Sequence, residues 1–310
     1  MFLRLLSVAA VMLLTVGALS AKDLKVLMIG NSFSICVGKH LPQIVASVPG
    51  HTLELTSCYI GGCTFDRHFG HLAQAENDPK HKPYRITKWV SGKAGSTSEK
   101  NSVNEMLKNN KYDIVTIQQG SSKCWDFNFY EPFAGDLIKY IRKHQPQAQI
   151  IIQQTWSYRF DAPRLKGWNF DQQGMYDRLN KAYAELAAKY KFQVIPTGDA
   201  VQLFRARTPK KFVPSDVKKF QYPAVPDHSG EVVGKYVWRK NPKTGKNYLW
   251  TDYIHFNKDG EYMQALVWFA KLYNEPVSKV KYVPANMSKE MDQLLRSCAQ
   301  DAVNNYKQVK

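Results

Sequence analysis

The chain has 310 residues and a formal net charge of +17, from 43 lysines and arginines against 26 aspartates and glutamates. This length suits one large α/β domain or two smaller ones, and no repeat or low-complexity linker divides it. The basic residues are spread along the chain, so an acidic polysaccharide or an anionic cell surface is a better partner than nucleic acid. A merely soluble basic surface is the alternative.

Residues 1–21 have the pattern of a secretory signal peptide. Arg4 precedes a short apolar run that closes on small residues, the last of them Ala21. The run is short for the ~20 residues of a membrane span, and Lys22 and Asp23 follow at once. No later stretch is apolar enough to cross a membrane. We therefore expect cleavage, a mature chain with no stable membrane span, and a periplasmic or extracellular location.

Short apolar runs alternate with amphipathic segments through the remaining chain, 22–310. The runs predict strands that are covered on both faces, and the amphipathic segments predict the helices that cover them. Strands are expected at 24–29, 52–56, 112–117, 149–153 and 192–195, and helices at 37–48, 103–108, 130–144, 175–190 and 258–273. The alternation predicts an α/β fold, a three-layer αβα sandwich with a mainly parallel sheet, and a C-terminal helical extension.

Two segments interrupt this alternation, 84–90 and 235–250. In the second, Asn-Pro-Lys-Thr-Gly separates two aromatic stretches with high strand propensity. This pattern predicts a β-hairpin within an insertion at about 210–250. The hairpin leads directly to Asp252, so we expect it to form one wall of a substrate cleft.

The chain contains five cysteines, and an odd number leaves at least one unpaired within a monomer. Cys58 and Cys63 are close enough in sequence to form a disulfide, which export would permit. Buried free thiols are the alternative. The cysteines are too few for a dense disulfide framework.

Ser32 lies where the first expected strand gives way to the first helix. In the sequence Ile-Gly-Asn-Ser-Phe-Ser its hydroxyl can face a cleft, and its backbone N–H can point at a developing negative charge. Ligands of open α/β sheets bind beyond the carboxyl ends of the strands, so the position suits a nucleophile. For this triplet alone, a plain turn is the alternative.

Asp252 and His255 are three residues apart on what we expect to be a bent loop. Both side chains can turn toward one serine, with His255 as the base and Asp252 as the group that orients it. Taken singly, Asp252 could instead cap the following helix. His255 could be a structural histidine bonded to local backbone.

Together these residues and a glycine block resemble the SGNH (GDSL-like) hydrolases. The resemblance rests on Gly30-Asn31-Ser32, Gly62-Cys63-Thr64, and Asp252 with His255, in that order. It covers about 24–273 and implies a flavodoxin-like αβα fold, carboxylic ester hydrolysis, and neither a metal nor an organic cofactor. It also implies that Ser32 is the nucleophile and that the N–H groups of Ser32 and Gly62 bind the oxyanion.

The third oxyanion donor departs from that family's pattern. Where a Gly-x-Asn-Asp block would be expected, this chain has Ile-Gln-Gln-Gly-Ser at 117–121. A glutamine amide can donate the same hydrogen bond. The spacing of Gln118 and Ser121 resembles the Gln-Gly-Glu-Ser segment of sialate O-acetylesterase-like members, which favours Gln118 over Gln119. The blocks together resemble a poorly characterised secreted bacterial branch.

Several side chains near the expected site could contact a sugar. Arg67 and His68 follow the glycine block, and Trp125, Trp156 and Tyr158 follow the ends of expected strands. Surface solvation is the commoner explanation for the first two residues. Packing is the commoner role of aromatic residues at such places.

The combined pattern predicts a secreted serine esterase that removes O-acetyl or similar acyl groups from carbohydrate, although acyl transfer to another sugar stays open. One rival is a metal-dependent hydrolase, because His68 and His71 have helical spacing and His81 is near, but the adjacent sequence offers no convincing carboxylate partner. The other rival is a non-catalytic carbohydrate-binding or adhesion protein. Export, charge and aromatic content favour that reading, but it does not explain the Ser, Gly, Gln and Asp/His blocks together.

Overall fold

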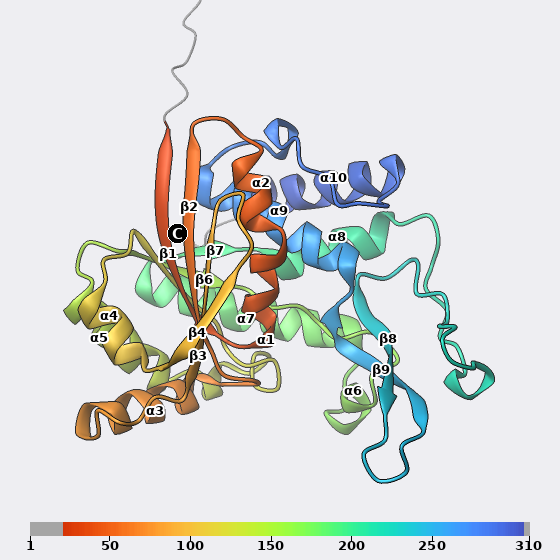
Figure 1. Cartoon of the computed structure of the whole chain (residues 1–310), viewed down its shortest axis with the longest axis horizontal. Helices are drawn as coiled ribbons and strands as arrows, with labels where there is room; N and C mark the ends of the chain where they lie inside the picture. Colours follow the sequence, from red (N-terminus) through yellow and green to blue (C-terminus); the bar gives the residue numbers. More distant parts are fainter. Residues whose placement is uncertain (1–20, 307–310) are drawn as a thin grey trace, which may run out of the picture.

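The computed structural model describes residues 21–306 (Figure 1). All but the last residue of the predicted signal peptide, 1–21, lies outside the described residues. Within 21–306, no helix is long and apolar enough to cross a membrane.

A seven-stranded sheet forms the centre of the described chain, in the order β4-β3-β2-β1-β5-β6-β7. Five neighbouring strands, β2, β1, β5, β6 and β7, are parallel. The other two, β3 and β4, are antiparallel and lie at one edge. The strands are β1 Lys22–Gly30, β2 His51–Tyr59, β3 Tyr84–Val90, β4 Ser96–Asn101, β5 Ile114–Ile117, β6 Gln149–Gln153 and β7 Gln193–Ile195. The predicted fold class is therefore confirmed.

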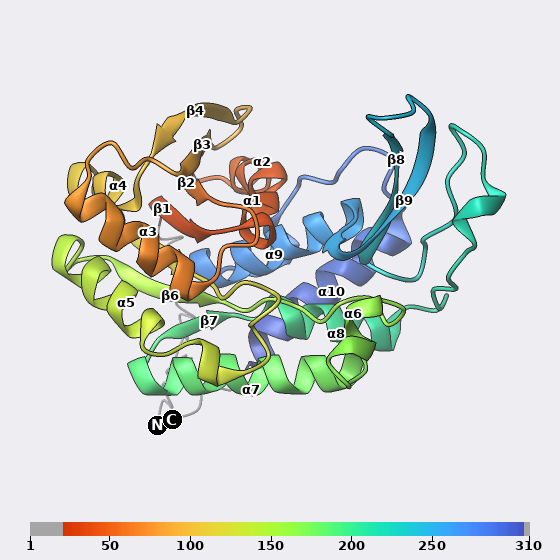
Figure 2. The same cartoon turned by 90° about the horizontal axis from the view of Figure 1, so that it is seen from below.

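Helices cover both faces of this sheet (Figure 2). On one face α3, α4 and α5 pack together, and on the other α2, α8, α9 and α10 form a continuous layer. The helices are α1 Ser32–Ile35, α2 Leu41–Ala46, α3 Phe65–Asn77, α4 Val103–Asn109, α5 Phe133–His144, α6 Pro163–Gly167, α7 Gln172–Tyr190, α8 Thr197–Arg207, α9 Lys258–Tyr273 and α10 Lys289–Asn305. Short 3₁₀ turns lie at Cys36–Lys39, Phe127–Phe129, Val217–Lys219 and Val277–Lys279.

The strand order predicts a ligand site beside the end of β1. The segment Val26–Ile29 is fully buried, as expected for a central strand with helices on both faces. β1 has β2 on one side and β5 on the other, so the order of the strands reverses at β1. In open α/β sheets the ligand site lies at such a reversal, beyond the carboxyl ends of the strands. Ser32 is two residues past the end of β1.

The predicted hairpin is confirmed and projects from the body of the molecule (Figures 1 and 2). β8 Val233–Lys240 pairs with β9 Asn247–Phe256 in antiparallel register. A small separate core lies under the hairpin, made of side chains from both strands and from the segment before them: Phe212, Tyr236 and Leu249, with Val217, Phe220 and Trp238 packed against them. β9 continues directly into α9, so the hairpin and the helical layer share one chain segment.

All five cysteines are free and buried, so Cys58 and Cys63 do not pair. Cys36 lies in the 3₁₀ turn after α1, where its thiol donates to Gln264 Oε1. The thiols therefore act as small apolar side chains in this fold.

Candidate active site

Ser32 occupies the first position of α1, and Asn31 separates it from the buried end of β1. Asn31 is the N-cap of this helix, and its Oδ1 accepts a hydrogen bond from the backbone N–H of Phe33 at 2.9 Å. The Asn31 amide also donates to the carbonyl of Cys63 at 2.9 Å. This side chain thus ties the turn that carries Ser32 to the loop that follows β2.

His255 connects Ser32 to Asp252 through two short hydrogen bonds. His255 Nε2 lies 2.8 Å from Ser32 Oγ, and His255 Nδ1 lies 2.8 Å from Asp252 Oδ2. The His255 side chain is 31% exposed, whereas that of Asp252 is 3% exposed. The structure therefore brings together the three residues that the sequence nominated, with the imidazole open to solvent and its carboxylate partner buried.

Asp252 is held as a carboxylate. Burial alone would raise its pKa, but the hydrogen bond and charge of His255, and the backbone N–H groups of Ile254 and His255, lower it to about 2. Both N–H groups donate to Asp252 Oδ1 at 3.0 Å. Asp252 does not cap α9, because Asn257 does so. The pair also lies on the end of strand β9 and not on a separate loop.

The low pKa of Asp252 predicts a pH-dependent contribution to stability. Its folded pKa lies below the ~3.9 of an unfolded aspartate, so the contribution is present above about pH 4 and is lost as the pH falls toward about 2. We expect the difference in Tm between wild type and Asp252→Asn to shrink as the pH is lowered through this window. Thermal scans at a series of pH values test this, and a constant difference would contradict it.

The backbone N–H groups of Ser32 and Gly62 are the two candidates for binding an oxyanion. Ser32 is the first residue of α1, so its own N–H has no intrahelical acceptor. Gly62 lies in an exposed turn with φ of +59°, which favours glycine. Within residues 21–306, neither N–H donates a hydrogen bond. Arg67 donates to the carbonyls of Gly61 and Gly62, at 3.4 and 3.1 Å, and so helps to hold this turn.

Gln118 and Gln119 are both buried after β5, but they are engaged differently. Gln118 Nε2 donates to Asn31 Oδ1 at 2.6 Å, and its second N–H has no acceptor in the described chain. The Gln119 oxygen accepts from the backbone N–H groups of Phe65 and Gly120, and its nitrogen donates to the carbonyl of Phe129. Gln119 therefore serves the backbone of neighbouring loops, whereas Gln118 adjoins the turn that carries the nucleophile.

The expectation that His68 meets substrate is wrong. His68 lies on the inner face of α3, is 1% exposed, and its Nδ1 is 2.9 Å from the Tyr84 hydroxyl. Burial lowers its pKa to about 3, so it is neutral and enclosed. His71 Nδ1 lies 3.0 Å from His81 Nε2. No group of three or more potential metal ligands occurs among the described residues.

The aromatic candidates serve mainly as packing. Trp156 and Tyr158 are completely buried, so neither can stack on a sugar. Trp125 is half-buried in a cluster with Phe129, Trp168 and Phe170.

A stack of three aromatic rings beside the triad is a feature that the sequence reading missed. The ring of Trp156 lies between those of Phe33 and Phe256, with centroid separations of 4.1 and 3.7 Å. Trp156 Nε1 also donates to the carbonyl of Ile254, and the Phe33 ring meets His255 edge-on at 5.6 Å. The stack thus supports the segments on both sides of the Ser32–His255 hydrogen bond.

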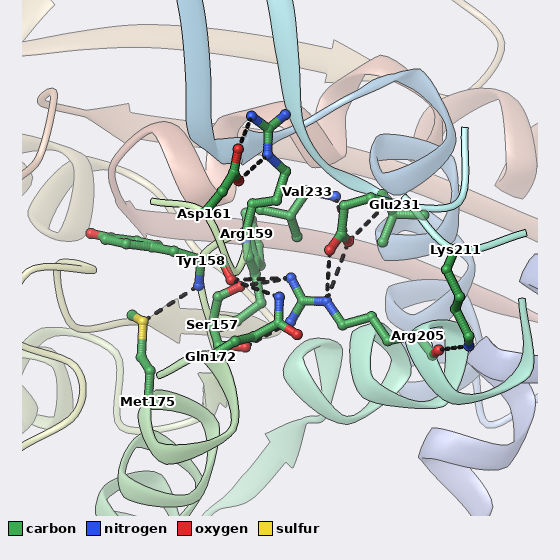
Figure 3. Close-up of polar contacts among 12 residues, drawn as sticks. Ser157, Tyr158, Arg159, Asp161, Gln172, Met175, Arg205, Lys211, Glu231 and Val233 are labelled. Atoms are coloured by element: carbon green, nitrogen blue, oxygen red, sulfur yellow. Dashed lines mark hydrogen bonds and ion pairs between the residues drawn. The ribbon is translucent and has the colours of Figure 1, made fainter. Parts of the chain in front are cut away.

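A buried ion pair holds the base of the hairpin (Figure 3). Arg205 on α8 donates through Nε to Glu231 at 3.0 Å and through Nη1 to Ser157 Oγ at 2.7 Å. The Glu231 carboxylate in turn accepts from the backbone N–H of Val233, and its own carbonyl accepts from Asn257. Three segments that are distant in sequence therefore meet where β8 begins and β9 ends.

Arg159 fills the space between this base and the small core under the hairpin. Its guanidinium forms two hydrogen bonds with Asp161, at 2.6 and 2.9 Å (Figure 3), and its backbone N–H donates to the carbonyl of Tyr253. At Gly234, with φ of +94°, a Cβ would lie 2.9 Å from both Arg159 Nη1 and the carbonyl of Asp252. Only glycine fits there, so the backbone of β8 can approach Asp252 closely.

The fold and the site define an α/β protein with a Ser–His–Asp constellation at the carboxyl edge of a parallel sheet. The pattern of a family described as "Domain of unknown function (DUF4886)" matches residues 25–223. The chain belongs to this family. The match ends before the hairpin that carries Asp252 and His255.

Solved structures resemble the chain to different degrees, and one from the same family shares its fold. A DUF4886 family protein from Bacteroides uniformis is 22% identical, with a TM-score of 0.73, over 93% of this chain and 98% of that one. A member of the lipolytic G-D-S-L family from Veillonella parvula is 10% identical, with a TM-score of 0.42, over 82% and 100%. An acetylxylan esterase from Geobacillus stearothermophilus is 13% identical, with a TM-score of 0.37, over 59% and 79%. No curated protein matches the chain.

Proposed function

We propose that this chain is a serine esterase that removes O-acetyl or similar small acyl groups from carbohydrate. The observation that carries the proposal is the continuous pair of 2.8 Å hydrogen bonds from Ser32 through His255 to the buried Asp252. A serine hydroxyl becomes a nucleophile when an oriented base can take its proton.

The chemistry follows from the positions of these atoms. His255 Nε2 takes the proton of Ser32 as Oγ attacks the ester carbonyl, and Asp252 fixes the imidazole tautomer and stabilises its cation. His255 then gives the proton to the departing alcohol. Water, deprotonated by the same imidazole, attacks the acyl-enzyme and releases the acid. The N–H groups of Ser32 and Gly62 and the amide of Gln118 are the proposed oxyanion donors.

The surroundings of Ser32 support a small acyl group on a large, open substrate. Phe33, Trp156 and Phe256 fill the space beside the triad, while Ser32 and His255 stay partly open to solvent. A hollow of about 670 Å³ elsewhere on the molecule is lined by residues at the amino edge of the sheet, among them Lys25, Glu54 and Asp113. It is remote from the triad and plays no part in the proposal.

Covalent labelling tests the central claim. A fluorophosphonate reagent should modify Ser32 in the wild-type protein, because the reagent reacts with serines that a neighbouring base activates. Peptide mass mapping locates the label, and His255→Ala should suppress it. A non-catalytic carbohydrate-binding protein would show no label, and labelling that survives His255→Ala would remove His255 from the mechanism.

We also propose that the protein is exported to the periplasm or beyond, on the sole basis of the signal-peptide pattern in 1–21.

An acetate-release screen over acetylated glycans, with Ser32→Ala as the control, would identify the sugar. Insensitivity of that activity to a chelator would dismiss the metal-dependent alternative.

A further inference from the structure

The two faces of the hairpin are chemically different. Residues directly opposite one another in an antiparallel pair point to the same side, and the side alternates along each strand. The pairs Lys235–Asp252, Val237–Trp250 and Arg239–Tyr248 therefore share one face. We name the non-catalytic members of this set the hairpin face: Lys235, Val237, Arg239, Tyr248 and Trp250.

The opposite face of the hairpin is already covered. Its pairs are Tyr236–Thr251, Trp238–Leu249 and Lys240–Asn247. Tyr236 and Leu249 are buried in the small core, and Trp238 packs against it. The hairpin face has no such cover from the described chain: Arg239 and Tyr248 are exposed, and the other three members are half-buried.

Arg239 is positioned to bind an anion. Its guanidinium lies over the ring of Trp250, with Cζ 3.4 Å from the ring centroid. No acidic side chain of the described chain forms an ion pair with Arg239 or with Lys235. Stacking on an aromatic ring restrains the long side chain, so less rotamer entropy is lost when the planar guanidinium binds a carboxylate through two hydrogen bonds.

The hairpin face leads to the catalytic residues. From Tyr248 the strand runs four residues to Asp252, about 14 Å at the usual rise of an extended strand. Lys235 is paired with Asp252, and its ammonium donates to the carbonyl of Phe256, next to His255, at 3.2 Å. The Arg205–Glu231 ion pair fixes the end of the hairpin where these residues lie.

We propose that the hairpin face binds an acidic polysaccharide, a chain of carboxylated sugars, and directs its acyl esters to Ser32. This inference rests on the proposed function and names its substrate class. Arg239 pairs with a sugar carboxylate, Lys235 supplies a second cation nearer the triad, and the rings of Tyr248 and Trp250 contact the apolar faces of the sugars. The mixture of cations and aromatic rings along one strand favours a flexible anionic glycan over a lipid surface, which would need a broader apolar face.

Binding to the Ser32→Ala protein tests this inference without any catalytic step. Titration calorimetry with polygalacturonate should show binding, and neutral xylan should bind much more weakly. Arg239→Gln should weaken binding of polygalacturonate about tenfold, on the scale of one charge-assisted hydrogen bond. Trp250→Ala should weaken it by a similar factor, because it removes the ring on which Arg239 stacks. Lys240→Gln is the matched control, since it removes an adjacent exposed cation of the same strand on the opposite face, and it should have little effect.

The outcomes separate the alternatives. If Lys240→Gln weakens binding as much as Arg239→Gln, the attraction is diffuse and the hairpin face is not a site. Preferential binding of phosphatidylserine vesicles or duplex DNA over polygalacturonate would also overturn the inference. In the catalytically active protein, which retains Ser32, Arg239→Gln should raise KM for acetylated polygalacturonate and leave kcat largely unchanged. Labelling of Ser32 without any binding of polygalacturonate would refute this inference but leave the esterase proposal standing.

Discussion

Ser32→Ala and His255→Ala should each lower kcat for a small acetyl ester by roughly 10⁴- to 10⁶-fold, the range for removing one member of a proton-transfer unit. The two residues act through one hydrogen bond, so the double variant should lose little more than either single variant. Steady-state kinetics on the three proteins measure this non-additivity. Tm should change little for Ser32→Ala, because within residues 21–306 the hydroxyl of Ser32 forms a hydrogen bond with His255 alone.

His71→Ala is the control for this experiment. His71 contacts His81 and lies outside the triad, so kcat should be unaffected. Wild-type activity in either triad variant would refute the assignment. A double variant that lost the full product of the two single effects would show that Ser32 and His255 act independently.

Gln118→Ala should lower kcat by roughly 10²- to 10³-fold, the effect of losing one oxyanion donor, with little change in KM. The structure adds a second expectation. Gln118 also donates to Asn31, the N-cap of α1, so the variant should lose some stability as well. Gln118→Glu retains the shape and replaces both N–H donors with a carboxylate oxygen, and it should show the same loss of kcat.

Gln119→Ala is the control for the oxyanion experiment. Its amide bonds only to backbone groups in the described chain, so its loss should reduce Tm and spare kcat in the folded fraction. A large kcat defect in Gln119→Ala alone would identify Gln119, and not Gln118, as the oxyanion donor. If neither variant loses kcat, the oxyanion is bound without a glutamine, although the esterase proposal would stand.

The elements that could be predicted are those with a strong local pattern. β1 contains the apolar run Val26–Ile29, β6 contains three consecutive isoleucines, and α9 begins at a capping asparagine, Asn257, and ends at Asn274 in the left-handed conformation. β4 was missed because its six residues, Ser96–Asn101, are polar and show no alternation. α3 was missed as well, although Phe65, His68 and Leu72 lie on one helical face, a spacing that would have predicted a buried His68.

The candidate site shows the same division between local and long-range information. Asp252 and His255 are close in sequence, so their shared role could be read directly. Arg205 and Glu231 are 26 residues apart, and Trp156 contacts the carbonyl of Ile254, 98 residues away. No local pattern encodes such pairs, because the sheet and the hairpin bring them together only after the whole chain has folded.

The burial of every cysteine has a consequence for redox chemistry. Burial raises the pKa of Cys36, Cys63 and Cys124 to about 12, and raises that of the other two as well. The reactive species in thiol–disulfide exchange is the thiolate. The buried thiols form little thiolate, so we expect them to react slowly with oxidants and disulfides in the folded protein. No disulfide among these five cysteines contributes to the stability of the fold. We expect oxidation of these thiols mainly before folding has buried them.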